Sequence, residues 1–153
     1  MDGRLFCEYK FKFYLNASHS IIIAGKQGEV HPHTWEITLE ILVERDEFME
    51  FNVYERVAQD FFASYQDRTL NDVQPFDTIM PTLENIVDYF GAQLRRNMRE
   101  VGGVLMRIEG SETPTRSYAV SYARDDEYIS DVKEHADDAL DHVIDEMLQR
   151  ALD

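Results

Sequence analysis

Cysteine is almost absent from this chain: Cys7 is the one cysteine among 153 residues. A single cysteine excludes an internal disulfide and any zinc site built from several thiolates. We expect Cys7 to be a small, buried hydrophobic residue, which is the usual role of a lone cysteine. The sequence also contains no apolar run near the roughly 20 residues that span a membrane. We therefore expect neither a disulfide-stabilised fold nor a membrane protein.

Basic residues are scarce, with 15 Lys and Arg against 30 Asp and Glu and a net charge of −15. Nucleic acids are held through Lys and Arg on their phosphates, so this composition argues against a nucleic-acid partner. The acids are concentrated at residues 124–153, which carry 11 acids and 3 bases. We interpret residues 1–123 as one domain with its own core and residues 124–153 as an acidic extension. The opening residues, MDGRLFCEYKFKF, have charges where a signal peptide needs an apolar core, so we expect a cytoplasmic protein.

Hydrophobic periodicity divides the chain into strands and helices. Alternation of apolar and polar residues predicts strands over 4–19, 33–45, 104–109 and 117–123. Spacings of three and four predict a helix over 52–66 that begins at Asn52, a helix over 81–101 and an acidic helix over 127–151. The Gly-containing residues 20–30 are expected to form a loop.

The order strand, strand, helix, helix, strand, strand indicates an α+β domain. We expect a four-stranded antiparallel sheet with both helices on one face, followed by the acidic C-terminal helix. A sheet of four strands has two open edges, and pairing edges between subunits would close them. We therefore expect a homo-oligomer.

Three of the five histidines can meet at one end of this sheet. His31 and His33 are separated by one residue, so their rings lie on the same face of an extended strand. If the first two strands pair antiparallel, His19 at the end of the first arrives beside them. Three imidazoles without a fourth protein ligand leave an open coordination position, which is typical of catalytic zinc. The alternative is that the His31 and His33 pair is a chance surface feature.

Four motifs together resemble one known family: NASHS at 16–20, HPHTWEITLEI at 31–41, PTLENIVDYF at 81–90 and ETPT at 112–115. In this order and approximate spacing over residues 8–122, they are similar to the 6-pyruvoyl-tetrahydropterin synthase and 6-carboxy-tetrahydropterin synthase family. The resemblance implies a T-fold (ββααββ) whose subunits assemble edge to edge into a trimer, with trimers often stacking into a hexamer. Such edge-to-edge assembly agrees with the homo-oligomer that we expect from the two open edges of the sheet.

The same resemblance implies a site for Zn²⁺ and a pterin-like small molecule. His19, His31 and His33 match the zinc ligands. Glu112 matches the glutamate that grips the guanidine-like edge of a pterin, and Thr113 follows it in the substrate-binding motif. A carboxylate suits that edge because it accepts two parallel N–H bonds. The alternative for Glu112 is an ordinary acidic residue in a turn.

The proton-transfer residues of the family are substituted in this chain. The family's base is a cysteine four residues before the first zinc-binding histidine of the pair, and Gln27, whose amide is no base, occupies that position. The assisting histidine aligns with Asp67, or with Arg68 if one gap is allowed. Some members use a glutamate as the base, and Glu29 is the nearest carboxylate to the histidine pair. Glu29 and Asp67 are therefore the candidate catalytic residues.

Three functions remain open. We expect a zinc-binding member of the family with a pterin-type pocket at subunit interfaces and without the standard reaction on dihydroneopterin triphosphate, because the usual base is missing. A triphosphate substrate needs Lys or Arg near it, and these residues are scarce here, which also argues against the standard reaction. One alternative is an active zinc-dependent pterin lyase that uses Glu29 or Asp67. The other is a non-catalytic oligomeric scaffold with an acidic interaction helix.

Overall fold

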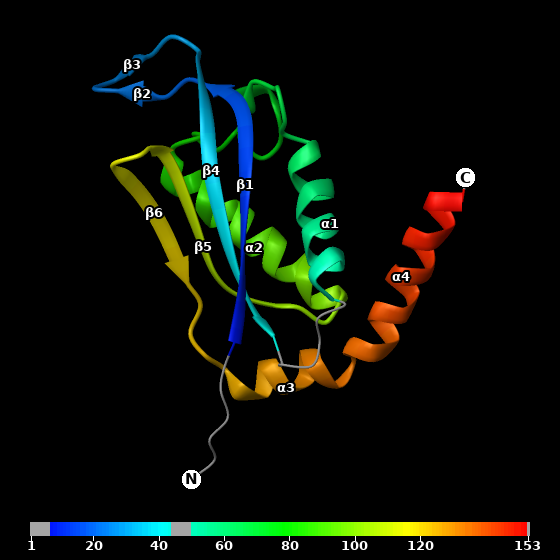
Figure 1. Cartoon of the computed structure of the whole chain (residues 1–153). Coiled ribbons are helices and arrows are strands. Elements are labelled where there is room, and N and C mark those ends of the chain that lie inside the picture. Colours follow the sequence, from blue (N-terminus) through cyan, green and yellow to red (C-terminus); the bar gives the residue numbers. More distant parts are fainter. Residues whose placement is uncertain (1–6, 44–49, 153) are drawn as a thin grey trace.

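The computed structural model describes residues 7–43 and 50–152. Its main sheet has four antiparallel strands in the order β1–β4–β5–β6 (Figure 1). These strands are β1 (Cys7–His19), β4 (His31–Val43), β5 (Val104–Thr113) and β6 (Arg116–Ser121). The predicted α+β class and the antiparallel sheet are confirmed. Residues 4–6 and 44–45, which we assigned to strands, lie outside the described residues.

β1 and β4 pair along their whole length, and each has one buried and one solvated face. The buried face of β4 carries Trp35, Ile37, Leu39 and Ile41, all at most 1% exposed. On the other face, Lys10 pairs with Glu40 at 3.0 Å and Lys12 with Glu36 at 3.3 Å. The period-2 alternation therefore specifies the register, because a slip of one residue would bury the charged set.

Residues 20–30 contain more structure than the predicted loop. They form a small ribbon of β2 (Ile22–Ile23) and β3 (Lys26–Gln27) that projects beyond the main sheet (Figure 1). Ala24 and Gly25 both have positive φ, at 51° and 78°. Two central residues with positive φ are typical of the type I′ turn, whose twist matches a tight hairpin.

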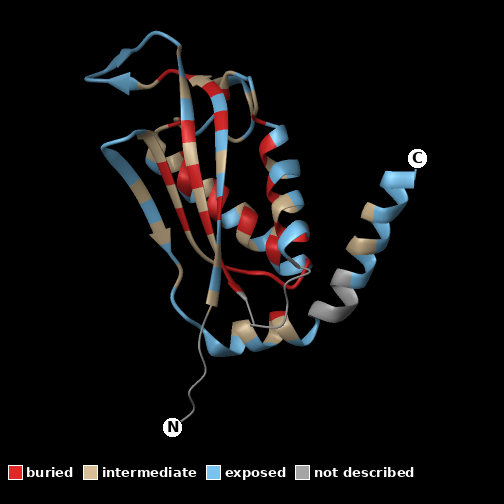
Figure 2. Cartoon of the chain, in the orientation of Figure 1, coloured by how far each residue is buried: buried red, intermediate tan, exposed pale blue. Residues whose placement is uncertain are grey.

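Helices α1 (Glu50–Ala63) and α2 (Leu83–Glu100) lie on one face of the sheet, with the short 3₁₀ turn η1 (Leu70–Asp72) between them. The buried residues concentrate between the helices and the sheet (Figure 2). The prediction of Asn52 as the N-cap of the first helix is wrong, because Asn52 lies inside α1. Phe51 packs its ring on Tyr9 and Phe11, at 5.4 and 5.0 Å between ring centroids. This packing stabilises Phe51 inside the helix, so α1 begins before Asn52.

α2 covers the predicted helix over 81–101 to within two residues at each end. Thr82 is the N-cap, and its side-chain oxygen accepts from the backbone N–H of Asn85 at 3.2 Å. The helix ends before Gly102, which has a φ of 78°. α2 lies directly against β5, because a Cβ added at Gly110 would stand 2.5 Å from Cγ2 of Val87. Glycine at this position lets the first turns of α2 approach the strand closely.

The acidic C-terminal segment forms two helices, α3 (Asp126–Glu134) and α4 (Ala136–Leu152), so the prediction of one continuous helix is corrected. The break falls at His135, whose Nδ1 donates to the Asp131 carbonyl at 2.9 Å. In an unbroken helix that carbonyl would accept the backbone N–H of His135, which bonds Lys133 instead. Among the described residues, no helix has both the length and the apolar character needed to cross a membrane.

Candidate functional site

The antiparallel register of β1 and β4 brings three histidines together at one end of the sheet. His19, the last residue of β1, is the direct partner of His31, the first residue of β4, and His33 follows on the same face. The ring centroids are 4.6 Å apart for His19 and His31, 5.0 Å for His19 and His33, and 4.7 Å for His31 and His33. One ligand atom from each ring lies within 4.8 Å of the other two. The predicted convergence is confirmed.

His19 is the buried member of this cluster, at 2% exposed. Its Nδ1 lies 2.6 Å from the Pro81 carbonyl, and a carbonyl can only accept, so Nδ1 carries the proton. Burial lowers the pKa of the His19 imidazole, and the neighbouring imidazoles lower it further. The Pro81 carbonyl and Glu112 act against this shift without reversing it. The ring is therefore neutral near pH 7, with its Nε2 lone pair available.

His31 is held in a similar way by the loop before β4. Its Nδ1 lies 3.0 Å from the backbone carbonyl of Glu29, so this nitrogen is the donor and Nε2 is again available. The contact uses the Glu29 backbone, while the residue itself is exposed. The structure thus connects Glu29 to the histidine cluster through its carbonyl oxygen.

Glu112, near the end of β5, lies beside the same cluster. Its Oε1 accepts from the indole Nε1 of Trp35 at 3.2 Å and stands 3.9 Å from Nε2 of His19. Trp35 is fully buried, and Glu112 accepts its N–H. Thr113 is exposed, and its hydroxyl lies 3.4 Å from that of Thr115. Glu112 therefore faces the histidines, while Thr113 continues into the turn toward β6.

Asp67 lines a hollow of about 400 Å³ that also includes His33. The lining residues are Asn16, Ala17, Ser18, Pro32, His33, Thr34 and Asp67. Asp67 has a φ of 60°, and its backbone N–H donates to the Asn16 carbonyl at 2.6 Å. This left-handed conformation turns the chain so that residues after Asp67 run beside β1, where Ser18 bridges Thr69. The structure thus brings Asp67 and His33 to one hollow.

Gln27, at the position of the family's base, makes a short contact in which its amide Nε2 donates to the Ser20 hydroxyl. Ser20 is in turn held by Asn71: its N–H donates to Oδ1 at 2.8 Å, and its carbonyl accepts from Nδ2 at 3.0 Å. These contacts tie the ribbon and the residues around η1 to the end of β1. Gln27 therefore has a structural contact at this position.

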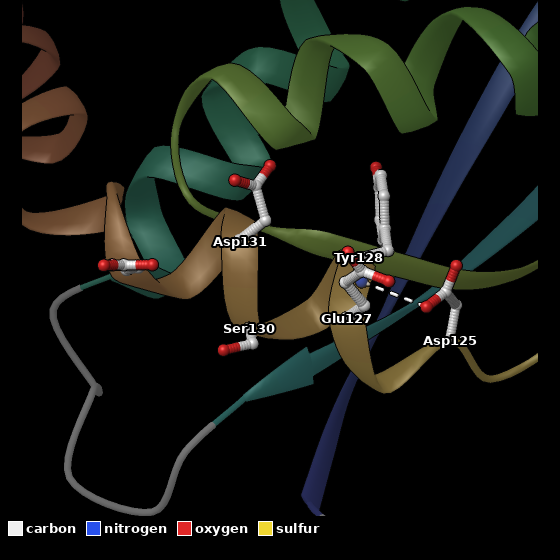
Figure 3. Close-up of a pocket in the computed structure, with 6 residues that line it drawn as sticks. Asp125, Glu127, Tyr128, Ser130 and Asp131 are labelled. Carbon is white, nitrogen blue, oxygen red and sulfur yellow. Dashed lines mark hydrogen bonds between the residues drawn. The ribbon is translucent and has the colours of Figure 1, made fainter.

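A separate hollow of about 550 Å³ lies over α3, at the acidic segment (Figure 3). Two of its four carboxylates already have structural partners. Asp125 caps α3 by accepting from the backbone N–H of Tyr128 at 3.1 Å, and Asp131 pairs with Arg99 at 2.7 Å. Its lining comes from α3 and the N-cap of that helix and includes none of the three histidines.

Two contacts of the site were not predicted from the sequence: the hydrogen bond from Trp35 to Glu112, and the one from His19 to the Pro81 carbonyl. Trp35 could have been found, since it is the only tryptophan and lies two residues after His33 on the same strand face. The Pro81 carbonyl leaves no such signal, because any residue has a carbonyl and its position depends on how α2 packs on the sheet.

A four-stranded antiparallel sheet backed by two helices, with three histidines at paired strand ends, defines a protein of the T-fold class. The family model for 6-pyruvoyl tetrahydropterin synthase matches residues 8–125. The chain belongs to the 6-pyruvoyl tetrahydropterin synthase family. No curated protein matches its sequence closely enough to count as a relative.

Solved structures with the same fold have low sequence identity to this chain. The Caenorhabditis elegans 6-pyruvoyl tetrahydropterin synthase is 16% identical with a TM-score of 0.64, over 80% of this chain and 100% of that one. The Plasmodium vivax synthase is 14% identical with a TM-score of 0.59, over 79% and 100%. Structures of the latter also exist with a catalytic glutamate replaced by alanine or cysteine. At these identities the likeness shows the fold alone.

Proposed function

We propose that this protein binds a zinc ion and a pterin-type small molecule at the histidine cluster, and that it does not carry out the family's standard reaction on dihydroneopterin triphosphate. The observation that carries the proposal is the convergence of three imidazoles beside the carboxylate of Glu112. The loss of the standard reaction follows from Gln27, which stands where the base is expected.

The three histidines fit zinc by their donor chemistry. His19 and His31 each donate from Nδ1 to a backbone carbonyl, which orients the ring and leaves Nε2 as the ligand atom. Burial keeps His19 neutral, and the neutral imidazole is the form that binds a metal. Zinc bound by these three imidazoles would supply a Lewis acid toward a substrate hydroxyl or a water.

Glu112 is the group that binds the pterin. A carboxylate can accept two N–H bonds from the guanidine-like edge of the ring. Trp35 uses its indole N–H to fix Oε1, which leaves Oε2 and the second lone pair of Oε1 for the ligand. Thr113, the next residue of β5, is proposed to take part in the same pterin-binding motif.

The pterin pocket is completed by other subunits. β1 and β6 are the outer strands of the sheet, so both have an edge that can pair with a second copy. Pairing in a closed ring gives the trimer, or the stacked hexamer, that the family resemblance implies. The histidine cluster lies at the end of β1, next to such an edge.

A second candidate function is an active pterin lyase with a substituted base. One observation favours Asp67, because it lines the same hollow as His33. Glu29 is the other candidate, and the catalytic glutamate of the Plasmodium vivax synthase shows that this residue type serves in the family. In either case the carboxylate would take a proton from the substrate side chain.

Chromatography of pterins after incubation of the zinc-loaded protein with 7,8-dihydroneopterin triphosphate separates these functions. We expect no 6-pyruvoyl or 6-carboxy product, together with retention of a pterin in equilibrium dialysis. Glu112→Gln should weaken that retention by about 10-fold or more, since a hydrogen bond to a charged group contributes about 1.5–3 kcal/mol. If a product forms, the standard reaction is present, and Asp67→Asn and Glu29→Gln then identify the base by which of them abolishes turnover.

Trp35→Phe should weaken pterin binding by about 2–10-fold, the range expected for loss of one ordinary hydrogen bond. Phenylalanine fills most of the indole's space but cannot donate to Glu112, so that carboxylate is no longer oriented. Zinc content should stay the same. Tyr54→Phe is the matched control, because it removes a buried donor near Gly102, at the opposite end of the sheet from the site. Equal pterin affinity in wild type and Trp35→Phe would contradict a role for Trp35.

A further inference from the structure

The tautomer of His19 depends on a single backbone carbonyl. Pro81 offers its carbonyl to Nδ1 of His19 at 2.6 Å, across 62 positions of sequence. If this carbonyl moved away, the proton could shift to Nε2, and the nitrogen that the Pro81 contact leaves available for a metal would lose its lone pair. The position of the Pro81 carbonyl therefore decides which nitrogen of His19 can bind a metal.

The turn that presents this carbonyl is held by Asn85, from the first turn of α2. The side-chain Nδ2 of Asn85 donates to the Met80 carbonyl at 2.9 Å. Its backbone N–H donates to the Thr82 hydroxyl at 3.2 Å. Asn85 thus holds the residue on each side of Pro81. The backbone of Thr82 closes the turn with a further bond to the Met80 carbonyl at 2.9 Å.

Pro81 cannot fix its own position through an N–H, because proline has none. The carbonyl is therefore aimed by its neighbours, and Asn85 contacts both of them. We propose that Asn85 is a positioning residue, which acts through the Met80–Thr82 turn to keep His19 in the tautomer with a free Nε2. This inference rests on the proposed metal site and extends it to Asn85, whose hydrogen bonds are with Thr82 and Met80.

Asn85→Asp separates positioning from helix stability. The aspartate keeps the backbone bond to Thr82 but loses the Nδ2 donor and places a carboxylate oxygen against the Met80 carbonyl. An acid in the first turn of a helix is favourable, so the melting temperature should be unchanged or higher. We expect zinc affinity to fall by about 10–100-fold, the usual cost of losing an outer partner of a metal ligand. Asn85→Ala, which lacks the repulsion, should also lose affinity.

The tautomer itself gives a readout that does not need the metal. In NMR spectra of the metal-free protein, the Nδ1–H of His19 should be protected from exchange in the wild type and lost or weakened in Asn85→Asp. Asn97→Asp is the matched control, because it makes the same change in the same helix about 18 Å further along, at 1.5 Å per residue. It should leave both the resonance and the zinc affinity as in the wild type.

Two outcomes overturn the inference. The first is a His19 resonance in Asn85→Asp that is the same as in the wild type. The second is that the wild type binds zinc and Asn85→Asp binds it with the same affinity. A wild type that binds no zinc contradicts the proposed function instead. In that case the His19 resonance alone decides whether Asn85 sets the tautomer.

Discussion

His31→Ala should weaken zinc binding by about 10²–10⁴-fold. Structural zinc binds with a free energy of about 10–16 kcal/mol, so one of three imidazoles carries about 3–5 kcal/mol of it. His31 suits the test better than His19, because His19 is buried and its removal would leave a cavity in the core. Competition with a chromophoric chelator measures the affinity.

Thermal unfolding gives a second measurement of the same variant. A ligand at 100 times its dissociation constant stabilises the folded state by about 2.7 kcal/mol. For a chain of this length that corresponds to a rise in melting temperature of about 5–10 °C, which His31→Ala should not show at the same zinc concentration. His142→Ala is the control, since His142 is exposed on α4 and pairs with Glu146 at 3.3 Å. If His31→Ala binds zinc as the wild type does, the histidine cluster is not the metal site.

The elements that could be predicted from sequence are those with a regular pattern and one buried face. Along β4, every second residue from Trp35 to Ile41 is buried, so the alternation gave both the strand and its orientation. The convergence of the histidines followed from one further assumption, the antiparallel pairing of β1 and β4. Because the side-chain period of a strand is two, His31 and His33 had to share a face.

The parts that could not be predicted depend on contacts between residues far apart in sequence. Trp35 and Glu112 are separated by 77 positions, and their hydrogen bond requires both the β4–β5 register and the length of each side chain. The break between α3 and α4 depends on one ring nitrogen of His135, which takes a carbonyl that the helix would have used. Apolar spacing over 127–151 continues through this break, so periodicity alone reports a single helix.

The acidic extension contributes contacts to the domain through α3. Val132 is 3% exposed and packs with Leu42 and Val104 at the far end of the sheet. The ring of Tyr128 is covered by the guanidinium groups of Arg95 and Arg99, at 4.5 and 5.3 Å from the ring centroid. α4 packs less closely: Val143, Ile144 and Met147 are only partly buried against the main core.

Ending the chain at residue 124 should therefore lower the free energy of unfolding by about 3 kcal/mol relative to a chain that ends at 135 and keeps α3. Burial of Val132 accounts for about 1.5–3 kcal/mol, and each cation–π contact of Tyr128 for about 0.5–1 kcal/mol. The chain that ends at 135 should lose less relative to the full-length protein, since Val143, Ile144 and Met147 on α4 are only partly buried. The Arg150–Asp60 pair is exposed and worth about 0–1 kcal/mol. Denaturant unfolding of the three chains measures both steps.

Zinc affinity provides the control for this comparison. Leu42 lies 11 residues along β4 from His31, or about 36 Å at 3.3 Å per residue, so loss of α3 should leave the metal site of the folded molecule unchanged. A chain ending at 124 with full stability would mean that α3 contributes nothing to the domain. The boundary predicted between residues 123 and 124 would then separate two independent parts, and the acidic helices would be free to act as the interaction element of the scaffold hypothesis. A loss of about 3 kcal/mol with normal zinc affinity would instead make α3 part of the folded domain, and would leave α4 as the segment available for a partner.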